Sequence, residues 1–113
     1  MPHINLNISK KLESSTKDTL QKEIAGIMTL IPGKNAANTL ICIIDNCTMY
    51  RDYEPLEAVF ADIRLLKDSP EESKAAFAEA LFKVIESVLI IPPAHVQMNF
   101  IPLPNWASGG VYR

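Results

Sequence analysis

The sequence predicts an α/β protein in which two consecutive β-α-β units form one four-stranded sheet with both helices on one face. Hydrophobic periodicity is the first observation, with a repeat of two residues in the strands and of about 3.6 in the helices. The second is the order strand, helix, strand, which occurs twice along the chain. Because 113 residues fit one domain, we expect a single domain over 1–113, with pseudo-repeated halves at about 1–50 and 51–113.

The first half contains a strand, a helix and a second strand. Residues 3–8 alternate between polar and apolar side chains, which predicts a strand. Residues 14–30 carry apolar side chains at helical spacing, with serines at the start as candidate N-caps and a Pro-Gly pair after the end. The β-branched and apolar residues 39–44 predict a strand buried on both faces, in which Cys42 would be a small buried hydrophobe.

The second half repeats this pattern. Residues 59–65 alternate and predict a third strand. The next helix is expected to begin with Ser69 as N-cap and Pro70 at the first helical position, and its apolar stripe continues to Val88. Residues 96–101 alternate again and predict the last strand.

One face of the predicted sheet has no helix to cover it. Each β-α-β unit is expected to pair its strands in parallel through a right-handed crossover, which places both helices on the same side. The open face would carry both polar and apolar groups: His3, Asn5, Asn7, Phe60, Asp62, Arg64, Gln97, Asn99, Ile101 and side chains from 39–44. This mixture favours a closed homo-oligomer around a wetted centre. The alternative is a two-layer monomer with a mixed outer face.

The composition indicates an ordinary globular protein. Hydrophobic residues make up 48% of the chain, and the net charge is −2 without a Lys/Arg cluster, so neither nucleic acid nor an anionic membrane is expected as a partner. No secretory signal or spanning segment is visible, and a cytoplasmic protein with reduced thiols is expected. Because His3 and His95 are isolated and no phosphate or dinucleotide loop is present, no metal or other cofactor is predicted.

Three segments of the chain match features of one known superfamily. Pro2 opens the first strand, and Gly33-Lys34 follows the first helix. Near the end, residues 93–100 read Pro-Ala-His-Val-Gln-Met-Asn-Phe, and residues 105–110 read Asn-Trp-Ala-Ser-Gly-Gly. Together these segments resemble the tautomerase superfamily, in particular its members akin to macrophage migration inhibitory factor and 4-oxalocrotonate tautomerase. The resemblance extends over essentially the whole chain.

The resemblance implies a homotrimer whose sheets surround a central channel, with active sites at the subunit interfaces. Each site would be built around Pro2 as catalytic residue. Lys34 matches a position that binds a substrate carboxylate or carbonyl, although a solvated lysine near a helix C-terminus is an equal alternative. Asn99 matches an asparagine that would orient a neighbouring subunit's substrate. The alternative role for Asn99 is a hydrogen bond between strands or in the channel. Gln97 stands where the relatives carry a tyrosine, which argues against a preference for aromatic keto acids such as phenylpyruvate.

Two further residues are candidates for substrate binding. Arg64 lies near the active-site segment of the superfamily and could bind a carboxylate through paired hydrogen bonds. Pairing with Asp62, two residues away on the same strand face, is the favoured alternative for Arg64. Trp106 could form a wall of the pocket, or the tail that contains it could pair with a neighbouring subunit.

Pro2 has the chemistry of a base only if Met1 is removed. A free α-amino group titrates at about 7.7–8.0, and an apolar environment or a neighbouring cation lowers that pKa. The amine could then take a proton from carbon beside a carbonyl and return it elsewhere on the enol. A retained Met1 would convert the nitrogen into an amide without a basic lone pair.

The sequence therefore predicts a cofactor-independent tautomerase that acts on a small carboxylated keto or enol substrate. Two alternatives stay open. One is hydration, decarboxylation or dehalogenation of an unsaturated acid by the same superfamily. The other is a non-catalytic trimer that acts through its surface as an interaction protein.

Overall fold

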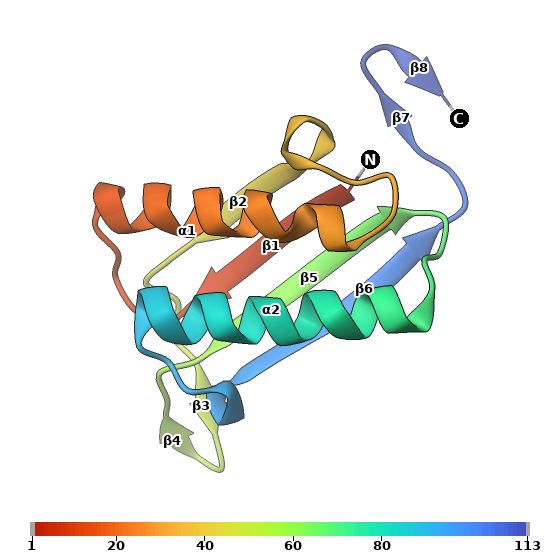
Figure 1. Cartoon of the computed structure of the whole chain (residues 1–113). Coiled ribbons are helices and arrows are strands. Elements are labelled where there is room, and N and C mark those ends of the chain that lie inside the picture. The colour runs from red at the N-terminus through yellow and green to blue at the C-terminus, as the bar shows by residue number, and fades with distance from the viewer. Residues whose placement is uncertain (1, 113) are drawn as a thin grey trace.

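A computed structural model describes residues 2–112 of the chain. It confirms the predicted α/β class, with a four-stranded sheet and two long helices on one face (Figure 1). The elements in chain order are β1 (Pro2–Ile8), α1 (Ser14–Ile27), η1 (Met28–Leu30), η2 (Ala36–Asn38), β2 (Leu40–Ile44), β3 (Tyr50–Arg51), β4 (Glu54–Pro55), β5 (Val59–Leu66), α2 (Glu71–Leu89), η3 (Pro93–His95), β6 (Val96–Leu103), β7 (Ala107–Ser108) and β8 (Val111–Tyr112).

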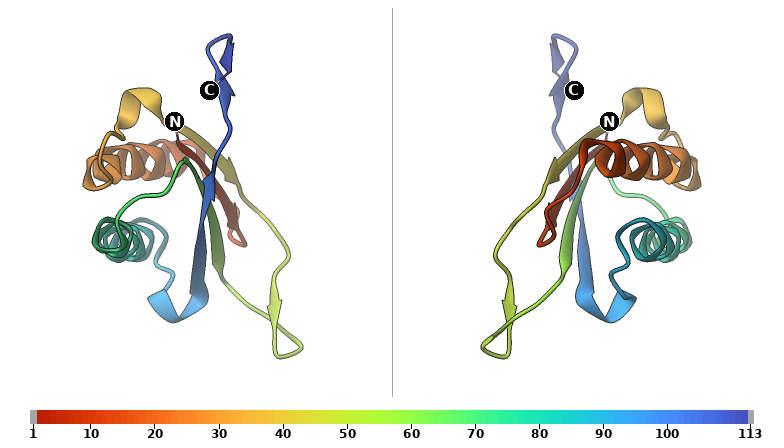
Figure 2. Two further views of the ribbon diagram at one scale, coloured as in Figure 1. Left: turned by 90° about the vertical axis from the view of Figure 1, so that its right-hand side faces the viewer. Right: turned by 90° about the vertical axis from the view of Figure 1, so that its left-hand side faces the viewer.

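The two β-α-β units meet at the centre of the main sheet, whose strand order is β2-β1-β5-β6. Each unit pairs its strands in parallel, β1 with β2 and β5 with β6, as predicted. The units join through an antiparallel pairing of β1 with β5, in which Pro2 lies opposite Leu65 and Ile8 opposite Val59. Views from the side show both helices on one side of the sheet and no helix on the other (Figure 2).

The core lies between the sheet and the helices. Strands β1 and β5 place every second side chain there, and the helices contribute one apolar stripe each. Each large apolar side chain that is fully buried contributes about 1.5–3 kcal/mol. The largest of them is Phe77 of α2, whose ring meets Phe100 of β6 edge to face at 6.1 Å between ring centroids.

Both helix starts differ from the predicted caps. The N-cap of α1 is Glu13, and no side chain caps the helix there, so the prediction of a serine cap was wrong. The N-cap of α2 is Pro70 and not Ser69, because the Pro70 carbonyl accepts the amides of Ser73 and Lys74, each at 3.1 Å. At the other end, α2 stops where Ile90 takes a left-handed conformation with φ of 57°.

Strand β2 was expected to be buried on both faces, and this expectation was wrong. It is an edge strand with a single neighbour, β1, and its even-numbered residues point away from the helices. Leu40 is therefore 69% exposed and Ile44 is 45% exposed, and Cys42 between them is exposed rather than buried.

Asp45 fixes the end of β2 to the start of α1. Its carboxylate accepts the Leu12 amide at 2.7 Å and lies 3.2 Å from the Lys17 ammonium. The hydrogen bond from Leu12, and then the Lys17 charge, lower the Asp45 pKa below its ordinary value of 3.8. These contacts hold the start of α1 against the end of β2.

Replacing Asp45 with Asn is expected to destabilise the fold at neutral pH and to have little effect in acid. A lowered pKa in the folded state contributes stability above the unfolded pKa, and this stability is lost as the pH falls through the folded pKa. Chemical denaturation of both chains between about pH 7 and pH 2 measures the difference. The asparagine still accepts the Leu12 amide, so a difference that stays constant down to pH 2 would contradict a charge effect.

Two short hairpins extend from the sheet and were not predicted. The β3–β4 hairpin leaves the sheet on the side opposite the helices (Figure 2). The β7–β8 hairpin projects beyond the end of the sheet where the chain begins (Figure 1). Their strands of two residues are too short to show an alternating pattern in the sequence.

Candidate functional site

Pro2 lies at one end of a central strand, where its side chain is buried on the helix side of the sheet. It shares that side with Ile4, Leu6 and Ile8, and its partner across the sheet is Leu65, which is fully buried. Apolar surroundings of this kind disfavour a protonated amine. Met1, whose removal the predicted chemistry requires, lies outside the described residues.

The segments that carry Lys34 and Trp106 reach the same end of the sheet. Lys34 is half-buried, and its amide donates to the Ile31 carbonyl at 3.1 Å. The connection that contains it runs into β2 beside His3, one residue from Pro2. Trp106 is half-buried just after β6, which ends beside β5 at the Pro2 end (Figure 1).

Arg64 lies close to Pro2 along the sheet but on the opposite face. It is exposed, and its neighbours across the strands are His3 and Ile101. Among residues 2–112, no ion pair involves Arg64 or Asp62, so the favoured pairing of these two side chains was wrong. Arg64 is exposed to solvent, where an ion pair contributes little to stability.

Gln97 and Asn99 lie farther from Pro2. Gln97 pairs with Phe60, which is four residues along β5 from Arg64, a separation of roughly 13 Å. Asn99 pairs with Asp62 between these two positions, and its Oδ1 atom is buried without a hydrogen-bond partner. One chain therefore brings Pro2, Arg64 and the Lys34 and Trp106 segments to one end of the sheet but does not bring Gln97 there.

The face without helices has the mixed composition that was expected. The β1 and β5 registers place its side chains in three rows across the sheet. The rows are Leu40–His3–Arg64–Ile101, Cys42–Asn5–Asp62–Asn99 and Ile44–Asn7–Phe60–Gln97. A hydrogen bond connects the second and third rows: the side-chain amide of Asn5 donates to Asn7 Oδ1 at 3.1 Å. On this face the edge strand β2 contributes mainly apolar side chains, β1 contributes polar ones, and β5 and β6 contribute both kinds.

A cavity of about 330 Å³ lies at the end of the sheet opposite Pro2. Gln97 is the one predicted site residue in its lining, and Arg51 and His95 also line it. Arg51 could not be placed from the sequence alone, because its contact is with the Ala94 carbonyl in η3, 43 residues away. Within the described part of the chain, no three His, Cys, Asp or Glu side chains gather as metal ligands, and no helix could cross a membrane.

Comparison with solved structures decides which fold this is. A structure of Leishmania major MIF2 superposes with a TM-score of 0.92 at 12% identity, covering 100% of this chain and 97% of the other. The macrophage migration inhibitory factor-like protein of Entamoeba histolytica superposes with a TM-score of 0.86 at 16% identity, covering 99% and 98%. The chain has the fold of macrophage migration inhibitory factor.

Two further solved structures have the same fold. Pt0534 inactivated by 2-oxo-3-pentynoate superposes with a TM-score of 0.86 at 14% identity, covering 96% of this chain and 94% of the other. A fused 4-OT asymmetric trimer gives the same TM-score and coverage at 16% identity. No protein-family model and no curated protein matches the sequence. The structural neighbours are those of the superfamily that the sequence resembles, which confirms the predicted fold.

Proposed function

We propose that this chain is a cofactor-independent tautomerase in which Pro2, freed by removal of Met1, is the catalytic base. Its substrate is a small carboxylated keto or enol acid. The observation that carries the proposal is the position of Pro2: it begins a central strand of the macrophage migration inhibitory factor fold, buried beside an apolar core. A secondary amine in apolar surroundings is neutral at a lower pH than one in water.

The proposed reaction moves one proton. The Pro2 nitrogen takes a proton from the carbon beside the carbonyl, so that a C–H bond breaks, an N–H bond forms and the electron pair moves to the carbonyl oxygen. The same nitrogen then returns the proton to another atom of the enol. Arg64 and Lys34, carried by segments at the Pro2 end of the sheet, would bind the substrate carboxylate and stabilise the negative charge on oxygen.

A site at the interface of a homotrimer fits the placement of the remaining residues. Gln97 and Asn99 lie too far along the sheet to join Pro2 of their own chain, so they would serve a neighbouring copy. The open face with its buried unpartnered Asn99 oxygen, and the exposed edge residues Leu40 and Ile44, support burial of this surface in an assembly. Trp106, at the Pro2 end, would form a wall of the site.

The experiment combines three readouts on one preparation. The intact mass is expected to lack Met1, and light scattering at micromolar concentration is expected to give about three times 12.6 kDa. Catalysis is followed by enol–keto conversion of phenylpyruvate and by deuterium uptake at the carbon beside the carbonyl of 2-oxobutanoate. Because Gln97 replaces an aromatic residue of the relatives, the aliphatic acid is expected to be the better substrate.

Labelling of Pro2 is an additional readout of the neutral amine. The triple bond of 2-oxo-3-pentynoate is conjugated to a carbonyl, so a neutral amine adds its N–H across that bond. One adduct on the N-terminal peptide is expected. A retained Met1 in material from the natural source, with no turnover of either acid, would contradict the proposal and favour a non-catalytic interaction protein.

A further inference from the structure

The cavity lined by Gln97 also contains an imidazole, that of His95. His95 ends η3 and immediately precedes β6, and both side chains line the same cavity of about 330 Å³. Under the proposed function, Gln97 serves the Pro2 site of a neighbouring copy. The cavity is then the part of that site which each chain provides to its neighbour, so His95 belongs to the neighbour's site as well.

A hydrogen bond to the backbone fixes the tautomer of the neutral His95 ring. Its Nδ1 atom lies 3.1 Å from the backbone carbonyl oxygen of Glu57. A carbonyl oxygen can only accept, so Nδ1 carries the hydrogen and the lone pair of the neutral ring is on Nε2. The ring can therefore accept a proton at Nε2 while Nδ1 keeps it in place.

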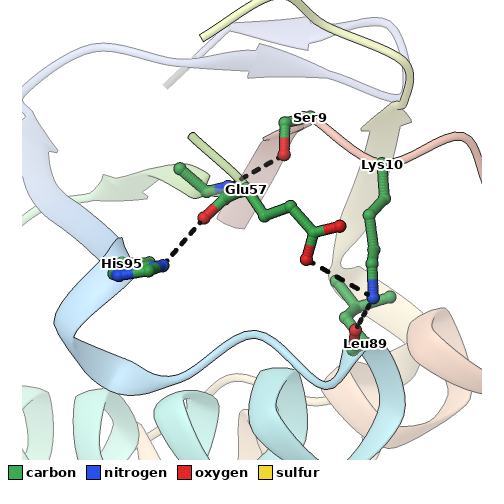
Figure 3. A network of polar contacts seen from close by, with 6 residues as sticks. Ser9, Lys10, Glu57, Leu89 and His95 are labelled. Atoms are coloured by element: carbon green, nitrogen blue, oxygen red, sulfur yellow. Dashed lines mark hydrogen bonds and ion pairs between the residues drawn. The ribbon is translucent and has the colours of Figure 1, made fainter. Parts of the chain in front are cut away.

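No carboxylate competes with a substrate for the groups of the cavity lining. The Glu57 carboxylate lies 3.8 Å from the Lys10 ammonium, and Figure 3 shows the Glu57 side chain extending toward Lys10 and away from His95. The charged side chain of the lining is Arg51, whose Nη1 atom donates to the Ala94 carbonyl at 2.9 Å. A cation at this position would stabilise negative charge that develops on a substrate oxygen.

The proposed reaction involves a proton on oxygen as well as one on carbon. When an enol becomes a keto acid, the hydroxyl proton must leave as the new C–H bond forms. Gln97 ends in a neutral amide, which binds oxygen through hydrogen bonds but does not take up its proton. Tyr50 also lines the cavity, but a phenol is already protonated at neutral pH. An imidazole is the side chain that most often takes a proton in such a step.

We infer that His95 of one copy is the catalytic base for the oxygen proton at Pro2 of the next copy. Nε2 takes the proton of the enol hydroxyl, so that an O–H bond breaks and an N–H bond forms. The released electron pair forms the C=O bond. The C=C electron pair takes a proton from the protonated Pro2 amine, which is left neutral. Both nitrogens return to their starting states by proton exchange with water.

This inference rests on the proposed function and extends it, because Pro2 then handles only the protons on carbon. The keto-to-enol direction uses the same two transfers in reverse. His95→Asn is the test variant, since an asparagine amide also carries an N–H that can donate to the Glu57 carbonyl but has no basic nitrogen. It is expected to lower kcat for the better keto acid by about 100- to 10,000-fold. KM is expected to change little, because His95 acts on the proton and not on the carboxylate.

Mixed trimers test whether His95 and Pro2 act from different copies. The His95→Asn chain is unfolded and refolded in a 1:1 mixture with a chain that carries Leu between Met1 and Pro2 and therefore has no free Pro2 amine. Each chain alone is expected to be nearly inactive. In random trimers, half of the Pro2 amines and half of the His95 rings are intact. If each site takes one group from each of two copies, about a quarter of the sites regain both.

Two substitutions control for changes elsewhere in the cavity. Glu57→Gln keeps the backbone carbonyl that His95 contacts and removes only the carboxylate near Lys10, so kcat is expected to be unchanged. Tyr50→Phe removes the phenol of the lining and is expected to keep most of the activity. Light scattering and circular dichroism verify that each variant has the mass and fold of the wild type. His95→Gln replaces His95→Asn if the asparagine variant does not fold.

The outcomes separate this inference from the proposed function. A wild type that turns over neither keto acid contradicts the tautomerase proposal, and the role of His95 with it. If the wild type is active, an unchanged kcat in folded His95→Asn would show that the oxygen proton does not pass through His95. A mixture no more active than its two parent chains would contradict action on another copy. A loss in Tyr50→Phe as large as that in His95→Asn would assign the proton to the phenol instead.

Discussion

A chain that keeps a residue in front of Pro2 is expected to lose tautomerase activity, by about 100- to 10,000-fold, the contribution typical of a general base. A peptide bond to the Pro2 nitrogen makes it a tertiary amide, whose lone pair is delocalised and takes no proton. The variant inserts Leu between Met1 and Pro2, because a large second residue prevents removal of the initiator methionine. Intact mass verifies the start of each chain, and kcat/KM for the better keto acid gives the loss.

Two controls separate this loss from damage to the fold. Pro2→Ala keeps a free N-terminal amine and is expected to lose less activity than the extended chain. The extended chain and the wild type should have the same oligomeric mass and thermal midpoint, since the added residues precede β1. Full activity in a chain proven by mass to retain its extension would contradict proline as the base.

Phe77→Ala is expected to lower the free energy of unfolding by about 3–5 kcal/mol, the usual cost of removing a buried aromatic ring. Phe77 is fully buried on α2 and its ring meets Phe100 edge to face, with 79° between the ring planes. The substitution removes this contact and leaves a cavity between α2 and β6, where close packing prevents full collapse. Urea denaturation followed by circular dichroism measures the change.

A matched substitution on the same helix tests the location of the effect. Phe82 is half-buried and packs at the border of the core, so Phe82→Ala is expected to cost less than Phe77→Ala. All chains are compared at one protomer concentration, because assembly makes apparent stability depend on concentration. Equal losses for both phenylalanines would contradict the packing of α2 on the sheet.

The elements whose periodicity is strong were predicted with small errors at their ends. Residues 3–8 and 59–65 alternate strictly, and they form most of the two central strands. Cap positions were predicted less well: Ser69 precedes Pro70 in a pattern typical of an N-cap, yet the Pro70 carbonyl makes the first helical bonds. The residue types favour Ser69 as the N-cap. The path of the backbone between β5 and α2, however, decides which carbonyl accepts the first helical hydrogen bond.

The candidate site, like the fold, could be predicted only in part from the sequence. Pro2, Lys34, Gln97, Asn99 and Trp106 could be found in the sequence because each belongs to a short motif that resembles the superfamily, whereas Arg64 was a candidate only from its position on the third strand. Their relation in space could not, since it depends on the antiparallel contact of β1 with β5. That contact places Arg64 near Pro2 and Gln97 far from it.

The sequence by itself determined the two β-α-β units, the side of the three alternating strands (3–8, 59–65 and 96–101) that faces the helices, and the open face. Those features follow from side-chain periodicity, which is a local property of the chain. Only the tertiary structure decided that β2 is an exposed edge, that Arg64 and Asp62 do not pair, and that Arg51 lies in a cavity with His95. These three features depend on which strands become neighbours and on where a hairpin folds back. Such contacts join residues that are tens of positions apart, and no local sequence pattern records them.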